Sequence, residues 1–282
     1  MIPLKLCSRD LFLLQGFLKY YMTIDQCFSY IHLLYSGDNS RLNKVYITQR
    51  LRKFFLKKIV GRGMCLLSRG LKPSYYFYLN YYYALRYVPE LEDLPHSSKM
   101  FSPINSSLIE HELMITDIML LMEKSFVDNG FQLVCFFRDG SYEDRFKFKN
   151  EVVSVKPDGV IIIQDKEGKK HLLFLEADRS SQELFSIGKW YHCIFRRLKK
   201  YESYLTSKKI NPVSFFKFAS ARLLFVTKSE ERIKNIITVC KNNMDNTDCF
   251  YLIPNKTLHS DKNLLIDGIW KGIKGNNCSL FQ

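Results

Sequence analysis

Carboxylate side chains stand beside two strongly apolar runs in the second half of the chain. Asp158 comes directly before the run GVIII, and Glu176 and Asp178 end the run HLLFLEAD. An unpaired carboxylate is costly to bury, so acids beside buried strands need a partner, a metal ion or water. Carboxylates on adjacent strand ends can hold Mg²⁺ or Mn²⁺, which would activate water and offset charge on a scissile phosphate. These spacings predict a nuclease centre, either working or vestigial.

The segments around these acids alternate between helical and strand-like patterns. The expected order is helix, three strands, helix, strand, helix and strand, which predicts an α/β sheet flanked by helices. Their ranges are 107–130, 132–137, 151–163, 171–178, 188–209, 221–227, 230–243 and 249–254. This order resembles the restriction-endonuclease-like, or PD-(D/E)xK, core. Pro157 and Asp158 match its Pro-Asp pair, and Glu176 matches the acid of its Glu-x-Lys motif.

The chain departs from that nuclease motif at one position. Asp178 stands where the motif has lysine, giving Glu-Ala-Asp. A lysine from the following helix could replace it in space, and Lys189 is the expected one. Without such a replacement, Asp178 makes the site more acidic and better suited to holding metal than to cutting DNA.

Positive charge is concentrated in the first third of the chain. The whole sequence carries 42 Lys and Arg against 28 Asp and Glu, and residues 1–88 carry 14 against 3. Such asymmetry is typical of a protein that binds a polyanion, most often nucleic acid. The alternative is that the charge serves only solubility.

The first third also has the periodicity of three helices followed by a hairpin. Apolar residues recur at helical spacing in 9–20 and in 24–34, where Thr23 is the expected N-cap. They recur again in a third segment that we expect to start after an N-cap at Thr48. The segments MCLLS and SYYFYL then predict two short strands, which completes the plan of a winged helix-turn-helix. Its third helix would meet DNA through Arg50, Arg52, Lys53, Lys57 and Lys58. The alternative is that this basic face is only solvated.

Composition and breaks in the pattern divide the chain into two domains. The stretch 90–106 mixes acids, prolines and serines and is the expected linker between domains at 1–89 and 107–282. No run of 18 apolar residues occurs, so no membrane span is expected. The eight cysteines form no CxxC pair, which favours a reduced, cytoplasmic protein. From the order of its segments, the chain is expected to have an α+β or α/β fold.

The ordered motifs resemble the replication-relaxation family of plasmid and mobile-element proteins. The resemblance runs through QRLRKFFLKKIVGRG, IEHELMITDIML, KPDGVIII, FLEADRSSQEL and GKWYHCIFRRLKKYESYL. It implies a DNA-binding protein that acts on double-stranded DNA, such as a plasmid origin, in replication, relaxation or mobilisation. A relaxase or replication protein would be its partner. The protein would act either as a metal-dependent nickase or endonuclease, or as a non-catalytic accessory. A winged-helix transcriptional regulator is the third alternative.

The resemblance also implies roles for individual residues. Asp158 and Glu176 would bind Mg²⁺ or Mn²⁺, with Glu112 as a third carboxylate. Lys189 would face the phosphate as a catalytic base or charge stabiliser. His111 would either approach the same site or bond internally at its helix start, and Arg179 would pair with Asp178 or Glu183.

Overall fold

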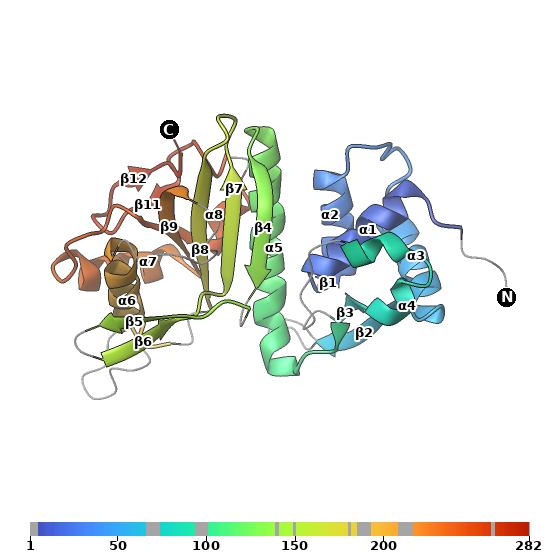
Figure 1. The fold of residues 1–282 in the computed structure, drawn as a ribbon, viewed down its shortest axis with the longest axis horizontal. Helices are drawn as coiled ribbons and strands as arrows, with labels where there is room; N and C mark the ends of the chain where they lie inside the picture. The colour runs from blue at the N-terminus through green and yellow to red at the C-terminus, as the bar shows by residue number, and fades with distance from the viewer. Residues whose placement is uncertain are drawn as a thin grey trace. The chain divides into compact units, whose positions relative to one another are not determined.

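The protein is a mixed α+β structure that divides into two compact units. The computed structural model describes residues 5–65, 74–93, 101–138, 141–148, 151–179, 182–184, 193–207, 217–260 and 263–281. The units are Met1–Leu120 and Leu121–Gln282 (Figure 1). The division falls inside one long helix, α5 (Ser106–Asp128), whereas the sequence predicts a boundary at 90–106. No helix in the described part of the chain is long and apolar enough to cross a membrane.

The first unit combines three helices with a small antiparallel sheet. Strand β1 pairs with β3, and β3 pairs with β2, so the sheet order is β1-β3-β2. A short helix and a 3₁₀ helix follow the sheet. The elements are α1 (Ser8–Lys19), β1 (Met22–Thr23), α2 (Ile24–Leu34), α3 (Lys44–Leu56), β2 (Val60–Cys65), β3 (Ser74–Leu79), α4 (Tyr81–Ala84) and η1 (Pro89–Asp93).

Side-chain caps set where α2 and α3 begin. Thr23 caps α2 as predicted, because its hydroxyl accepts from the Gln26 amide while the Gln26 side chain accepts from the Thr23 amide. The predicted cap of α3 at Thr48 is wrong. Asn43 caps that helix by accepting from the Tyr46 amide at 2.8 Å, and Thr48 lies inside it with its hydroxyl bonded to the Lys44 carbonyl. An earlier Asn supplies an equally good cap, so α3 gains a full turn.

Strand β2 begins at Val60, earlier than the predicted strand MCLLS, and it contains two glycines. Gly61 and Gly63 lie within the strand, although glycine ordinarily weakens one. A Cβ added at either position would lie 2.2 Å from the ring of Tyr78 or Tyr76 respectively. The tyrosine rings of β3 therefore cover the glycines of β2, and no larger residue fits beneath them.

A buried ion pair joins α1 to α3. The Asp10 carboxylate is only 2% exposed and accepts from the Cys7 amide at 2.9 Å. Arg50 donates to both of its oxygens, through Nε at 2.8 Å and through Nη2. Arg50 is predicted from the sequence to contact DNA, but in the structure its guanidinium binds Asp10.

The second unit is built on a seven-stranded mixed sheet in the order β12-β11-β10-β9-β8-β7-β4. Its central strands β8, β9 and β10 are parallel, and the remaining pairs are antiparallel. The elements after α5 are β4 (Gln132–Arg138), β5 (Asp144–Phe148), β6 (Glu151–Val155), β7 (Gly159–Gln164), β8 (Lys170–Asp178), α6 (Ile194–Thr206), β9 (Phe218–Thr227), α7 (Glu230–Lys241), β10 (Phe250–Pro254), α8 (Asn255–Leu258), β11 (Trp270–Lys271) and β12 (Asn277–Cys278).

The single strand predicted over 151–163 is two strands. Its first part, β6, pairs with β5 in a separate two-stranded sheet, and its second part, β7, belongs to the main sheet. The chain turns between them at Lys156, Pro157 and Asp158, where the proline has no amide to donate to a strand. Strand β5 is not predicted from the sequence, because its charged residues obscure the strand pattern.

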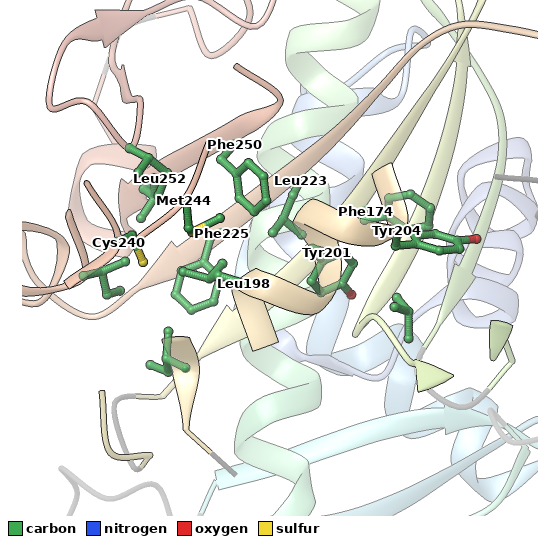
Figure 2. Close-up of a cluster of buried hydrophobic side chains, with 14 of the residues drawn as sticks. Phe174, Leu198, Tyr201, Tyr204, Leu223, Phe225, Cys240, Met244, Phe250 and Leu252 are labelled. Atoms are coloured by element: carbon green, nitrogen blue, oxygen red, sulfur yellow. The ribbon is translucent and has the colours of Figure 1, made fainter. Parts of the chain in front are cut away.

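Helices α6 and α7 share one apolar core with the sheet. Figure 2 shows Leu198 and Tyr201 of α6 beside Phe174, Leu223 and Phe225 of the strands. Strand residues whose side chains point to the opposite face of the sheet, such as Ile161 of β7 and Leu173 of β8, are also fully buried. Both faces of the central strands are therefore covered, which explains their near-continuous apolar sequences.

Removing Arg50 is expected to destabilise the first unit strongly. Arg50→Met leaves Asp10 buried without its counter-ion, and breaking such a pair costs about 3 kcal/mol or more. The exposed Arg52→Met is the matched control and should change the free energy of unfolding by no more than about 0.5 kcal/mol. Urea unfolding monitored by circular dichroism measures both. Equal effects of the two substitutions would contradict a structural role for Arg50.

Candidate functional site

The structure brings Asp158 and Glu176 together on neighbouring strands. Strands β7 and β8 are antiparallel with Gly159 opposite Leu175, and extending this register by one residue sets Asp158 opposite Glu176. Asp158 lies at the turn into β7, and its Oδ2 accepts from the Ala177 amide at 2.7 Å. The amide bond fixes the first carboxylate against the strand that carries the second.

Glu176 is held by two side chains from α6. It is 2% exposed, and each of its oxygens accepts a strong hydrogen bond. Arg197 Nη1 donates to Oε2 at 2.8 Å, and the Tyr201 hydroxyl donates to Oε1 at 2.6 Å. Arg197 also donates to the Gln182 side chain at 3.0 Å. Because Arg197 and Tyr201 are one helical turn apart, α6 presents both donors to the same carboxylate.

Burial dominates the ionisation of this cluster. Burial raises the pKa of Glu176 to about 7, although Arg197 opposes the rise, and the nearby Asp158 adds to it. Burial and the adjacent Glu176 raise the pKa of Tyr201 well above its ordinary value, so this phenol stays protonated and acts as a donor. Glu176 therefore changes charge near neutral pH, while its hydrogen-bond donors do not.

The acid pair opens into a cavity of about 230 Å³ that also contains cations. Lys156 and Lys200 line it with Arg197 and the two acids. Burial lowers the pKa of Lys200, and the positive charges of Arg196 and Arg197 lower it further. Lys156 bonds Glu143 at 2.9 Å. The cavity thus combines two carboxylates with three basic side chains, a mixture that can receive an anionic group as well as a cation.

Asp178 has a structural role in a different cluster. Its Oδ2 accepts from the Thr227 hydroxyl at 2.9 Å and from Arg232 Nε at 3.1 Å. These bonds tie β8 to β9 and α7, and Asp178 is not among the described residues that line the cavity. Arg232 offsets the charge of Asp178, and the expectation that Asp178 makes the acid site more acidic stays a prediction.

The described side chains do not fit a divalent metal ion as they are arranged. No group of three or more His, Cys, Asp or Glu residues in the described part of the chain is placed to hold one. Both Glu176 oxygens are engaged, and the Arg197 guanidinium already supplies the positive charge beside them. A Mg²⁺ ion at this carboxylate would be repelled by the adjacent guanidinium, so the present arrangement favours the ion pair over a metal ion.

The remaining predicted site residues are distributed over the chain. Lys189 lies outside the described residues. His111 and Glu112 lie on the part of α5 that belongs to the first unit, so their association with the acid pair stays a prediction. Arg179 is exposed at the end of β8, and its predicted pairing also stays a prediction. Arg197 is not among the predicted site residues, although it lies four residues before Tyr201 in the predicted helix.

The predicted DNA-contacting residues fall into two groups. Arg52, Lys53 and Lys58 are exposed, and Lys57 is half-buried. Lys58 follows α3 with a positive φ of 60°, and its ammonium lies 5.6 Å from the centre of the Tyr83 ring. Arg50 stands apart because of its bond to Asp10. We call Arg52, Lys53 and Lys58 the exposed basic strip of α3; Arg50 is not part of it.

Stability is expected to depend on pH through Glu176. A carboxyl whose folded pKa of about 7 exceeds its unfolded value contributes stability at low pH, and loses it as pH rises through 7. Relative to Glu176→Gln, the wild type should lose roughly 1–3 kcal/mol of unfolding free energy between pH 5 and 8. Urea unfolding across this range measures the loss, with the exposed Glu231→Gln as control. Parallel curves for wild type and Glu176→Gln would contradict the assignment.

Comparison with known proteins leaves the family open. No family model matches the chain, and no curated protein matches it. Protein VC1899 from Vibrio cholerae, known from its crystal structure, is similar over 87% of this chain and 53% of its own, with 14% identity and a TM-score of 0.33. The chain thus spans about half the length of that protein. A likeness this distant carries no argument about fold or function.

Proposed function

We propose that the protein binds DNA through its first unit and serves the replication, relaxation or mobilisation of a plasmid or other mobile element. The observation that carries this proposal is the exposed basic strip on α3, next to the hairpin of β2 and β3. The element order α1, β1, α2, α3, β2, β3 and the sheet order β1-β3-β2 support a winged helix-turn-helix, in which the third helix enters the major groove.

Charge is the main physical support for this interface. Lysine and arginine side chains that neutralise phosphates release counter-ions, which makes affinity fall steeply with salt. Arg52 and Lys53 lie one after the other on the exposed side of α3, and Lys58 follows the helix. Arg50 contributes indirectly, by fixing α3 against α1 through Asp10. We assign phosphate contact to the exposed group alone.

Removing Arg52 and Lys53 together is expected to weaken duplex binding. Losing two phosphate contacts should raise Kd about tenfold or more on any sequence and reduce the slope of log Kd against log salt by about 2. Fluorescence anisotropy with a labelled duplex at several salt concentrations measures both quantities. Lys234→Ala with Lys241→Ala, which removes the same charge from the exposed side of α7, is the matched control. Equal losses in the two double variants would remove α3 from the interface.

The second unit supports a nuclease-like fold with an accessory role. Helix α5, the antiparallel strands β4, β7 and β8, helix α6 and the parallel strand β9 follow the order of the PD-(D/E)xK core. The facing pair of Asp158 and Glu176 favours a metal-dependent nickase as a second candidate function. The bonds from Arg197 and Tyr201 to Glu176 favour the accessory role, because they engage both of the carboxylate oxygens that a metal ion would use.

A plasmid-nicking assay separates these two functions. Purified wild type is incubated with supercoiled plasmid, with and without Mg²⁺ or Mn²⁺, beside Asp158→Asn and Glu176→Gln. For the accessory role we expect a mobility shift of the plasmid and no conversion to open circles beyond that of the variants. Metal-dependent nicking by wild type, lost in both variants, would establish the nickase and overturn the accessory role.

A further inference from the structure

An arginine lies between two exposed aromatic rings on the first unit. The Arg62 guanidinium of β2 is 4.6 Å from the centre of the Phe55 ring of α3 and 4.9 Å from that of Tyr75 of β3. Met64, which pairs with Tyr75, is 55% exposed, Leu56, which follows Phe55 in the chain, is 70% exposed, and Tyr75 is 43% exposed. We call these five residues, Phe55, Leu56, Arg62, Met64 and Tyr75, the aromatic platform.

The strand register gathers the platform on one face of the hairpin. Met64 pairs with Tyr75 across β2 and β3, and Arg62 is two residues from Met64, so all three side chains point to the same side. Gly61 and Gly63 alternate with them and face the opposite side, beneath the rings of Tyr78 and Tyr76. The glycines thus leave room for the rings of Tyr76 and Tyr78 on one face while the platform occupies the other.

The chemistry of the platform matches an unpaired nucleobase. A base offers a flat, apolar π-face, which aromatic rings and a guanidinium plane can both stack on, and carries a phosphate that basic residues attract. Arg52 and Lys53 precede Phe55 on α3 and are exposed, so cationic groups lie next to the apolar surface. This complementarity favours DNA over a protein partner, for which a cationic border would be selective only toward acidic surfaces.

Paired bases cannot use such a platform. In a duplex the base faces are stacked on one another, so a protein reaches only groove edges and the backbone. We infer that the aromatic platform binds unpaired bases, and that the DNA substrate is a duplex with a melted or single-stranded segment. This inference rests on the proposed DNA binding and adds the class of DNA to it.

Anisotropy titrations with two labelled DNAs test the inference. One DNA is a fully paired duplex, and the other has the same sequence in one strand and a central mismatched bubble. Wild type is expected to bind the bubble more tightly. Tyr75→Ala should weaken bubble binding about 5-fold or more, because one base–aromatic stack contributes roughly 1–3 kcal/mol, and should leave duplex binding within about 2-fold. Tyr75→Phe keeps the ring and should bind as wild type does.

Two further variants separate stacking from charge and from exposure. Arg62→Lys keeps the positive charge but loses the planar guanidinium, so bubble binding alone should weaken. Tyr82→Ala removes an aromatic ring that is 81% exposed on α4 and should affect neither DNA. An unchanged circular dichroism spectrum and thermal midpoint confirm that each variant folds.

Each contrary outcome has its own meaning. Equal wild-type affinity for bubble and duplex overturns the platform's role while leaving DNA binding intact. A loss in Tyr75→Ala that is the same for both DNAs overturns it as well, because the ring then serves the hairpin rather than a base. No binding of either DNA by wild type overturns the proposed function together with this inference.

Discussion

The structure depends on buried carboxylates that take a counter-ion from a neighbouring helix, as Asp10, Glu176 and Asp178 do. In the first unit Arg50 of α3 neutralises Asp10 of α1, and in the second Arg197 of α6 neutralises Glu176 of β8. Removing one partner of such a pair leaves an uncompensated charge in a medium that solvates it poorly. These pairs therefore fix where α3 and α6 lie against their neighbours, and with them the surfaces that each unit presents.

The same constraint shapes the proposed function. Because Arg50 fixes α3 from its buried side, Arg52 and Lys53 stay exposed on that helix and can contact the phosphates of a polyanion. In the second unit the same kind of ion pair engages a candidate catalytic residue instead of leaving it exposed. Arg197 and Tyr201 each donate to one oxygen of Glu176, so the residue best placed for chemistry is held within the scaffold. DNA binding is thus the function that the exposed groups support, and cutting is the one that the buried bonds disfavour.

Periodic segments were predictable, and side-chain partnerships were not. The helix capped by Thr23, the strand that ends at Asp178 and the proximity of Asp158 to Glu176 follow from local pattern and motif order. The start of α3 was missed because Asn43 and Thr48 are both good caps, and only tertiary packing selects one. The partners of Arg50 and Asp178 were missed because Asp10 and Arg232 lie 40 and 54 residues away in the chain. Sequence separation of that size leaves no local signal.

The central claim is that α3 and the β2–β3 hairpin hold DNA. Hydrogen–deuterium exchange of the full chain, with and without saturating duplex, tests it most directly, because it reports which backbone amides the DNA protects. We expect slower exchange in peptides covering 44–65 on addition of DNA, and unchanged exchange in peptides covering 230–241 of α7. Protection confined to the second unit, with 44–65 unaffected, would contradict it.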